Sequence, residues 1–112
     1  MITRRVVIAD RVPLDLAKIT EFCQRWHVTE FALFGSVVRE DFRKDSDVDV
    51  LVTFAMDAST SLFDLSTMQA ELQVMFGYAV DLVSRRGIER SRNIARREEI
   101  LQSAEVIYHE AA

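Results

Sequence analysis

The chain has 112 residues, 49% of them hydrophobic and 29% charged, a composition that predicts one ordinary domain with a single compact core. A formal net charge of −4, from 14 basic and 18 acidic residues, argues against a nucleic-acid binder held by phosphate contacts. There is no apolar run long enough to span a membrane, and the N-terminal run Val6–Ala9 is too short for a signal peptide, so we expect a cytoplasmic protein.

The N-terminal part of the chain predicts a helix followed by a strand. Pro13 suits the first turn of a helix. Apolar residues then recur at spacings of three and four, which predicts a helix over residues 13–26 with a stripe of Leu16, Ile19, Cys23 and Trp26. The single cysteine lies in this stripe, so we expect it to fill the core. Residues 28–34 are rich in β-branched and aromatic side chains and predict a strand that ends at Gly35-Ser36.

The next segment predicts a short helix, a polar turn and a second strand. Ser36 is expected to cap a helix over residues 37–42, and residues 43–46 form the turn. The strand over residues 47–54 opens with Asp47 and Asp49. Side chains alternate along a strand, so these two acids point to the same face. The strand then becomes almost continuously apolar, which predicts a central strand covered on both faces over that half.

The second half predicts a helix, a third strand and a last helix. Ser61 and Asp64 form a capping-box pattern for a helix that ends at Gly77. Its apolar residues at helical spacing are Leu62, Leu65, Met68, Leu72 and Met75. A strand over residues 78–83 carries one acid, Asp81. We expect a basic loop over residues 84–90 and a final helix over residues 91–109 that buries Ile94, Leu101, Ala104 and Tyr108.

The acids of the two later strands form a candidate metal site. Buried carboxylates are normally neutralised, paired or bound to metal. If the strands are neighbours, Asp47, Asp49 and Asp81 converge at one edge of the sheet, where hard oxygen ligands suit Mg²⁺. Two such ions can assist in-line attack on phosphorus. A glycine before Ser36 lets backbone N–H groups approach a phosphate. A lone Asp-x-Asp is weak, and the acids could merely cap strand ends, but the joint spacing is far more restrictive.

The stretch LFGSVVREDFRKDSDVDVLV resembles the signature of the minimal nucleotidyltransferase (MNT) family, in the DNA polymerase β-like nucleotidyltransferase superfamily. The shared pattern is Gly-Ser, ten residues, Asp-x-Asp, and a third acid on a later strand. The stretches VDLVSRRG and RNIARREEILQSAEVIY also resemble these proteins. The resemblance implies a nucleotidyltransferase fold of the α/β (α+β) class over residues 1–112 as one domain. We expect a small mixed sheet of three or more strands, with helices mainly on one face.

The resemblance also implies the roles of individual residues. The phosphates of ATP would be bound by Gly35, Ser36 and Arg39. Two Mg²⁺ ions would be ligated by Asp47 and Asp49, while Asp81 would complete one metal site and help to deprotonate the attacking hydroxyl. The chain departs from the GSRARG sequence that is frequent in the family, because Val37 and Glu40 stand where an arginine and a glycine are frequent. The triphosphate therefore has one basic residue fewer nearby.

The family includes antitoxins of HEPN-domain ribonuclease toxins. The resemblance therefore implies a Mg²⁺-dependent protein adenylyltransferase that transfers AMP from ATP to a tyrosine of such a toxin. Small-molecule relatives usually carry a further helical domain for the acceptor, so we expect a partner protein to supply it here. Neutralisation by binding alone and transfer to a small molecule are alternatives. A docking surface or a solvated helix face would explain the arginine cluster of Arg85, Arg86, Arg90, Arg92, Arg96 and Arg97.

Overall fold

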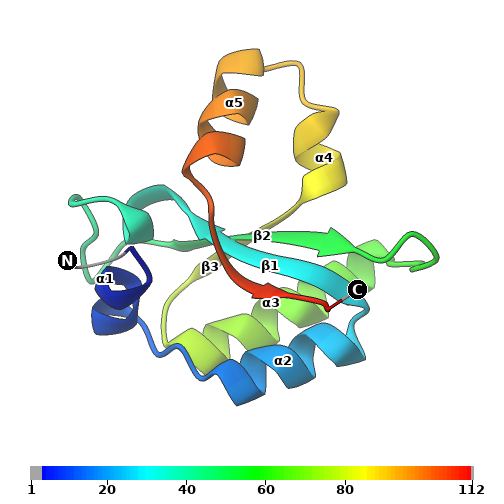
Figure 1. The fold of residues 1–112 in the computed structure, drawn as a ribbon, viewed down its shortest axis with the longest axis horizontal. Helices are drawn as coiled ribbons and strands as arrows, with labels where there is room; N and C mark the ends of the chain where they lie inside the picture. The colour runs from blue at the N-terminus through cyan, green and yellow to red at the C-terminus, as the bar shows by residue number, and fades with distance from the viewer. Residues whose placement is uncertain (1–3, 112) are drawn as a thin grey trace.

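The computed structural model describes residues 4–111, which form a four-stranded sheet with helices on both faces (Figure 1). The strand order is β3-β2-β1-β4, with β1 antiparallel to β2 and β4, and β2 parallel to β3. This mixed sheet confirms the predicted fold class. The elements in chain order are α1 (Arg4–Arg11), α2 (Leu16–Arg25), β1 (Val28–Phe34), the 3₁₀ helix η1 (Gly35–Val38), β2 (Val48–Phe54), α3 (Leu62–Phe76), β3 (Val80–Ser84), α4 (Arg85–Glu89), α5 (Ile94–Ser103) and β4 (Glu105–His109).

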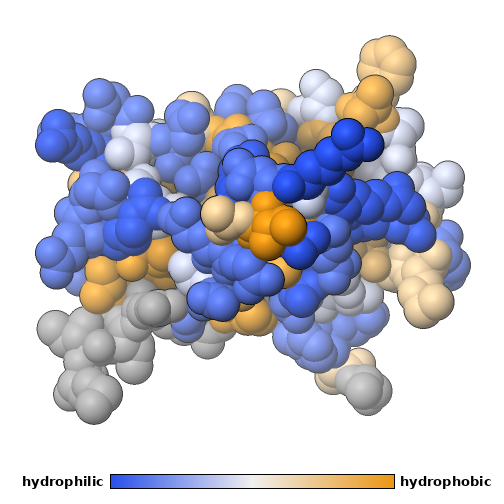
Figure 2. Space-filling model, turned by 90° about the horizontal axis from the view of Figure 1, so that it is seen from above, coloured by the Kyte–Doolittle hydropathy of each residue, from blue (hydrophilic) through white to orange (hydrophobic). Residues whose placement is uncertain are grey.

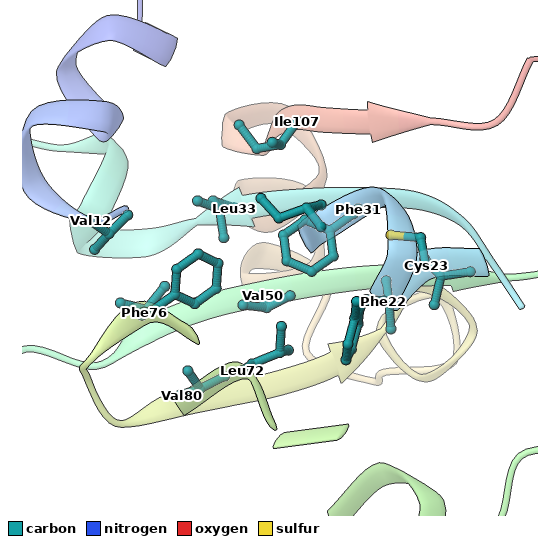
Figure 3. Close-up of a cluster of buried hydrophobic side chains, with 14 of the residues drawn as sticks. Val12, Phe22, Cys23, Phe31, Leu33, Val50, Leu72, Phe76, Val80 and Ile107 are labelled. Carbon is teal, nitrogen blue, oxygen red and sulfur yellow. The ribbon is translucent and has the colours of Figure 1, made fainter. Parts of the chain in front are cut away.

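The larger hydrophobic core lies between the sheet and the helices α2 and α3 (Figure 3). The rings of Phe22 in α2 and Phe31 in β1 meet edge to face with their centroids 6.1 Å apart. Cys23 is buried beside them, as predicted, and burial raises the pKa of its thiol to about 12. An uncharged thiol in an apolar setting behaves as a small hydrophobic side chain, so Cys23 contributes to packing.

A smaller core covers the other face of the sheet. Ala32 and Phe34 of β1 and Leu51 of β2 pack there against Ile88 of α4 and Ile100 of α5. Figure 1 shows α4 and α5 on the face opposite α2 and α3. Strand β2 is therefore central in the sheet and covered on both faces at its apolar half, which confirms the sequence prediction. None of the helices within residues 4–111 is long and apolar enough to cross a membrane.

Local capping signals explain where α2 begins and where α3 begins and ends. Ser61 and Asp64 form both hydrogen bonds of the predicted capping box, and α3 ends at Gly77, whose φ is +74°. Helix α2 begins at Leu16, later than predicted, because the Asp15 side chain accepts a hydrogen bond from the Lys18 N–H and caps the helix there.

The predicted buried faces of these two helices were only partly right. Leu16 is 49% exposed and Leu62 is 84% exposed, so neither joins the core. Phe22 and Phe76 are buried although the predicted stripes left them out. Leu16 and Leu62 are the first residues of α2 and α3. Phe22 and Phe76 lie three and four residues after the buried Ile19 and Leu72, so they share the buried face of each helix.

Three further expectations, for residues 84–90, for the last helix and for the N-terminal segment, were wrong or incomplete. The segment predicted as a basic loop forms α4, because the Ser84 hydroxyl accepts a hydrogen bond from the Gly87 N–H and caps a short helix. The predicted last helix stops at Ser103, and β4 follows as an edge strand beside β1. There Val106 is exposed and Ile107 is buried, the alternation of a strand. Helix α1 had no counterpart in the sequence prediction.

Candidate active site

Two of the three predicted acids lie side by side on the face of the sheet that carries α4 and α5. The side chains of Val48 and Val50 belong to the larger core, so Asp49 between them points to the opposite face. Val80 of β3 also belongs to the larger core, and Asp81 follows it. The parallel register pairs Asp49 directly with Asp81. The predicted pairing of these two strands is confirmed, and it brings both carboxylates to the same place.

Asp47 occupies a different setting from its two partners. It precedes β2, which begins at Val48, so the strand opens one residue later than predicted. The Asp47 side chain is exposed, whereas Asp49 and Asp81 are half-buried. All three acids nevertheless interact electrostatically, because the carboxylates of Asp81 and Asp47 both act on Asp49.

The Gly-Ser segment lies against Asp49 because β1 runs antiparallel to β2. The last residue of β1, Phe34, is paired with Asp49, and Gly35 comes next. Gly35 has φ +73°, and a Cβ atom at this position would lie 2.0 Å from Oδ2 of Asp49. Both the backbone conformation and the close approach exclude a side chain here. Glycine is therefore required if this carboxylate is to keep its position.

The helix predicted over residues 37–42 is wrong. The chain makes only the 3₁₀ turn η1, which has no side-chain cap, and Arg39 already has an extended backbone with φ −112° and ψ 176°. Val37 explains the short turn because its side chain is fully buried in the larger core and anchors the loop there. Position 37 therefore faces the core, while Glu40 is exposed.

A cavity of about 180 Å³ adjoins Gly35 and Asp49. Its walls come from β1, the loop after η1, β2 and α5, and its lining residues are Phe34, Gly35, Arg39, Asp49, Arg96, Glu99, Ile100 and Ser103. The predicted residues Ser36, Asp47 and Asp81 lie outside this lining. The contribution of α5 was missed by sequence reasoning. Asn93 caps α5 by accepting a hydrogen bond from the Arg96 N–H. An asparagine at this position could have predicted where α5 begins, but not that α5 packs beside the cavity.

The charges around this cavity are unbalanced toward the negative. Burial raises the pKa of Asp49 to about 6, and the nearby carboxylates of Asp81 and Asp47 add to the effect. Arg39 and Arg96 act in the opposite direction without cancelling it. Arg39 forms an ion pair with Asp41 at 3.1 Å. The Nη1 atom of Arg39 lies 3.7 Å from Oε1 of Glu99, which also lines the cavity. A cationic group placed beside Asp49 would therefore be stabilised.

The same residues fit a divalent metal ion in charge and ligand type. Carboxylate oxygens are the ligands that Mg²⁺ prefers, and the neighbouring acids raise the cost of ionising Asp49 when no cation is close. Within residues 4–111, no group of three or more His, Cys, Asp or Glu side chains is already gathered around a common metal position. A metal ion held by all three carboxylates together would therefore require them to move closer to one another.

Another cavity, of about 390 Å³, lies at the opposite end of β2 and is larger than the first. Its walls include Phe54, Leu65 and the short helix α4, and it contains Arg85 and Glu89. These two side chains approach each other to 3.7 Å as an ion pair. The candidate chemistry therefore belongs to the smaller cavity, which is lined by Asp49 and Gly35.

Sequence reasoning also missed Arg11, which lies at the end of α1. Its Nη1 atom donates hydrogen bonds to the carbonyl oxygens of Val37 at 2.9 Å and Ser36 at 3.3 Å. The same atom also donates to the carbonyl oxygen of Arg39. No local pattern in the sequence marks this contact, because it joins residues more than twenty positions apart.

The arginine cluster divides into two groups in the structure. Arg85 approaches Glu30 to 3.8 Å, and Arg97 donates a hydrogen bond to the carbonyl oxygen of Glu89 at 3.4 Å, so both help to hold α4 and α5. The exposed members of the cluster are Arg86, Arg90, Arg92 and Arg96. Figure 2, which looks down on the face bearing α4 and α5, shows a largely hydrophilic surface around a small apolar patch.

Comparison with known proteins gives a consistent result. A family model described as a nucleotidyltransferase domain matches residues 17–106. The protein adenylyltransferase MntA of Thermococcus cleftensis is 36% identical over 69 residues, which are 62% of this chain and 68% of that protein. A solved structure of a candidate minimal nucleotidyltransferase is 30% identical, with a TM-score of 0.63 and coverage of 93% of this chain and 95% of that one.

Two toxin–antitoxin structures share the fold at lower identity. One, described as a toxin–antitoxin with AMP-PNP, has a TM-score of 0.66 at 18% identity and covers 86% of this chain and 74% of that chain. The other, a tri-AMPylated Shewanella oneidensis HEPN toxin in complex with an MNT antitoxin, has a TM-score of 0.58 at 16% identity and covers 96% and 73%. At these identities the likeness shows a shared fold.

Proposed function

The chain belongs to the nucleotidyltransferase domain family, and from this premise we propose that it is an antitoxin that adenylylates a toxin. It transfers AMP from ATP to a tyrosine hydroxyl of a cognate HEPN ribonuclease and so silences that partner. We assign residues 1–112 to one nucleotidyltransferase domain and place the reaction in the cytoplasm, where ATP is available. No direct contact with nucleic acid is part of the proposal.

The observation that carries this proposal is the juxtaposition of Gly35 with two carboxylates. Asp49 and Asp81 are paired across neighbouring strands, and Gly35 approaches Asp49 so closely that no side chain fits between them. A phosphate needs close backbone approach, and the metal ions that accompany it need carboxylates. A site that offers both at one edge of a sheet suits a nucleoside triphosphate.

We assign each residue of the site a role in the reaction. Gly35 and Ser36 bind the phosphates, with Arg39 at the rim of the cavity. The tyrosine oxygen attacks the α-phosphorus, the bond between that phosphorus and the oxygen leading to the β-phosphate breaks, and pyrophosphate leaves. Asp81 accepts the proton of the tyrosine hydroxyl. Positioning of the two reactants supplies much of the rate enhancement.

Mg²⁺ is the metal we assign to the carboxylates. Asp47, Asp49 and Asp81 would hold two such ions, and bound Mg²⁺ neutralises the charge that develops on the transferred phosphoryl group and on the departing pyrophosphate. Without a cation, the burial of Asp49 and its repulsion by the carboxylates of Asp81 and Asp47 oppose its full ionisation. Bound Mg²⁺ would therefore also offset the negative charge that Asp47, Asp49 and Asp81 bring together.

The names of similar proteins support a protein acceptor. The Thermococcus cleftensis relative is a protein adenylyltransferase, and the Shewanella oneidensis complex contains an AMPylated HEPN toxin with an MNT antitoxin. One structural neighbour is described as a toxin–antitoxin with AMP-PNP, an analogue of ATP. We therefore assign ATP as the donor, and a HEPN-domain protein is the acceptor to test first.

The test is transfer of label from ATP carrying a radioactive α-phosphate. The purified chain, Mg²⁺ and a folded cognate HEPN-domain protein should yield a labelled partner, and mass spectrometry should locate AMP on a tyrosine. A variant with Asp47→Ala and Asp49→Ala should fold normally and transfer no label. If that variant still protects cells from the toxin as well as the wild type does, neutralisation occurs by binding and the enzymatic proposal fails.

A further inference from the structure

We propose that Arg11 is a positioning residue that holds the Gly-Ser loop, residues 35–39, in the conformation that binds nucleotide phosphates; this rests on the proposed function. A single atom, Nη1, donates to the carbonyl oxygens of Ser36, Val37 and Arg39. Three acceptors from one short loop thus converge on one cationic donor. Hydrogen bonds with a charged partner are roughly twice as strong as neutral ones.

These contacts fix the direction of the loop amides. In a trans peptide the C=O and the following N–H point in opposite directions. When Arg11 binds the carbonyls of Ser36 and Val37, the N–H groups that follow each of them are turned away from Arg11. The loop then cannot reverse these peptide groups without losing a charged hydrogen bond. Arg11 therefore restricts the backbone directly after Gly35 and Ser36, the residues to which we assign phosphate binding.

Arg11 is itself held by two other segments. Its guanidinium carbon lies 5.8 Å from the centroid of the Phe42 ring, in the segment that leads to Asp47. Its carbonyl oxygen accepts a hydrogen bond of 3.3 Å from the hydroxyl of Tyr78, two residues before β3. Arg11 thus joins the Gly-Ser loop to the segments that lead into both acid-bearing strands, and its side chain has a defined direction.

Val37 explains why this support comes from α1. An arginine is frequent at this position in the family, but here the side chain is valine and is fully buried in the larger core. It can anchor the loop by packing and cannot supply a charge. Arg11 brings a guanidinium to the carbonyl of the same residue from another helix. The chain therefore combines an apolar anchor inside the loop with a cationic one outside it.

The test uses two substitutions at Arg11 and a matched control. Arg11→Met keeps an apolar stem beside Phe42 and removes the donors, whereas Arg11→Lys keeps a cation with three donors on one nitrogen. Arg25→Met is the control. Arg25 also ends a helix and also lies near a ring, with its guanidinium carbon 5.7 Å from the centroid of Trp26. Its partners, however, are Glu21 at 3.0 Å and Glu71 at 2.6 Å, away from the Gly-Ser loop.

Two quantities are measured on each folded variant: binding of a fluorescent ATP analogue with Mg²⁺, and amide hydrogen exchange over residues 35–39 without nucleotide. Arg11→Met should weaken binding about tenfold or more and accelerate loop exchange by a similar factor, since small misplacements of a binding group are costly. Arg11→Lys should recover most of both. Arg25→Met should lower the melting temperature and leave both quantities unchanged.

Equal loop exchange in Arg11→Met and the wild type would overturn the proposal, as would faster exchange with unaltered nucleotide binding. It would also fail if Arg25→Met matched Arg11→Met in both measurements, because the effect would then follow stability alone. Failure of Arg11→Lys to recover either quantity would contradict the requirement for a cation. A wild-type chain that binds no nucleotide refutes the proposed function instead, and the exchange data still show whether Arg11 orders the loop.

Discussion

Replacing Asp49 with asparagine should make the protein more stable at neutral pH while abolishing nucleotidyl transfer. Asp49 is half-buried beside two other carboxylates, and these surroundings raise its pKa from the ordinary value of 3.8 to about 6. The folded protein therefore resists ionisation of this side chain. Asparagine has nearly the same shape and no charge to bury, so it removes the cost together with the proposed metal ligand.

The sign and size of the effect follow from proton linkage. A carboxyl group whose pKa is higher in the folded state stabilises the fold fully below pH 3.8, and that contribution is lost as the pH rises through about 6. At 1.36 kcal/mol per pH unit, the interval gives an upper bound of about 3 kcal/mol. Partial solvent exposure screens the interaction, so we expect about 1 to 2 kcal/mol above pH 7. In a domain of this size that corresponds to roughly 3 to 8 °C in melting temperature.

The assay is a series of thermal melts from pH 4 to pH 8 without divalent metal. The stability of Asp49→Asn relative to the wild type should increase as the pH rises toward 6 and then remain constant. Asp41→Asn is a control of opposite sign, because a hydrogen bond from Arg39 lowers the pKa of Asp41. That variant should be slightly less stable at neutral pH. A pH-independent difference between Asp49→Asn and the wild type would refute the electrostatic reasoning, whatever its effect on activity.

Further substitutions test the Gly35 contact, the cap of α3 and the exposed arginines. Gly35→Ala should abolish transfer activity and should lower the stability more than Gly77→Ala does. Both glycines have positive φ, but only a Cβ at position 35 would collide with another residue, Asp49. Equal losses of about 1 to 2 kcal/mol in thermal melts would contradict this contact. Ser61→Ala should cost about 1 kcal/mol in urea unfolding through the lost capping box and leave transfer unchanged. Toxin association, measured by calorimetry, should weaken when glutamate replaces the exposed arginines Arg86, Arg90 and Arg92; unchanged affinity would make them a solvated face.

Local signals in the sequence located much of the fold. The capping box at Ser61 and the glycine at position 77 bounded α3 because both act within a single turn of chain. The alternation of acid and apolar residues from Asp47 onward placed Asp49 on one face of β2, and the register with Asp81 agreed with the inferred chemistry. Features set by neighbouring residues were therefore predictable.

Long-range contacts were not predictable in this way. Residues 105–109 read as the end of a helix, and only the free edge of β1 made them a strand. Arg96 reaches the cavity because Ile100 seats α5 on the sheet, and no motif records that packing. Arg11 lies far in sequence from the loop it contacts. Each of these outcomes depends on which segments meet in three dimensions.

The effect of Gly35 and Asp49 on the stability of the fold helps to decide between catalysis and neutralisation by binding alone. Gly35 is held at a positive φ against a carboxylate, and Asp49 is kept in surroundings that oppose its ionisation. The first feature confines position 35 to glycine, the second reduces stability at neutral pH, and neither lies among the exposed arginines that could contact a partner. Violations of local folding rules concentrate where function requires them. An antitoxin acting only by association would gain stability from replacing Asp49, so its presence favours nucleotidyl transfer.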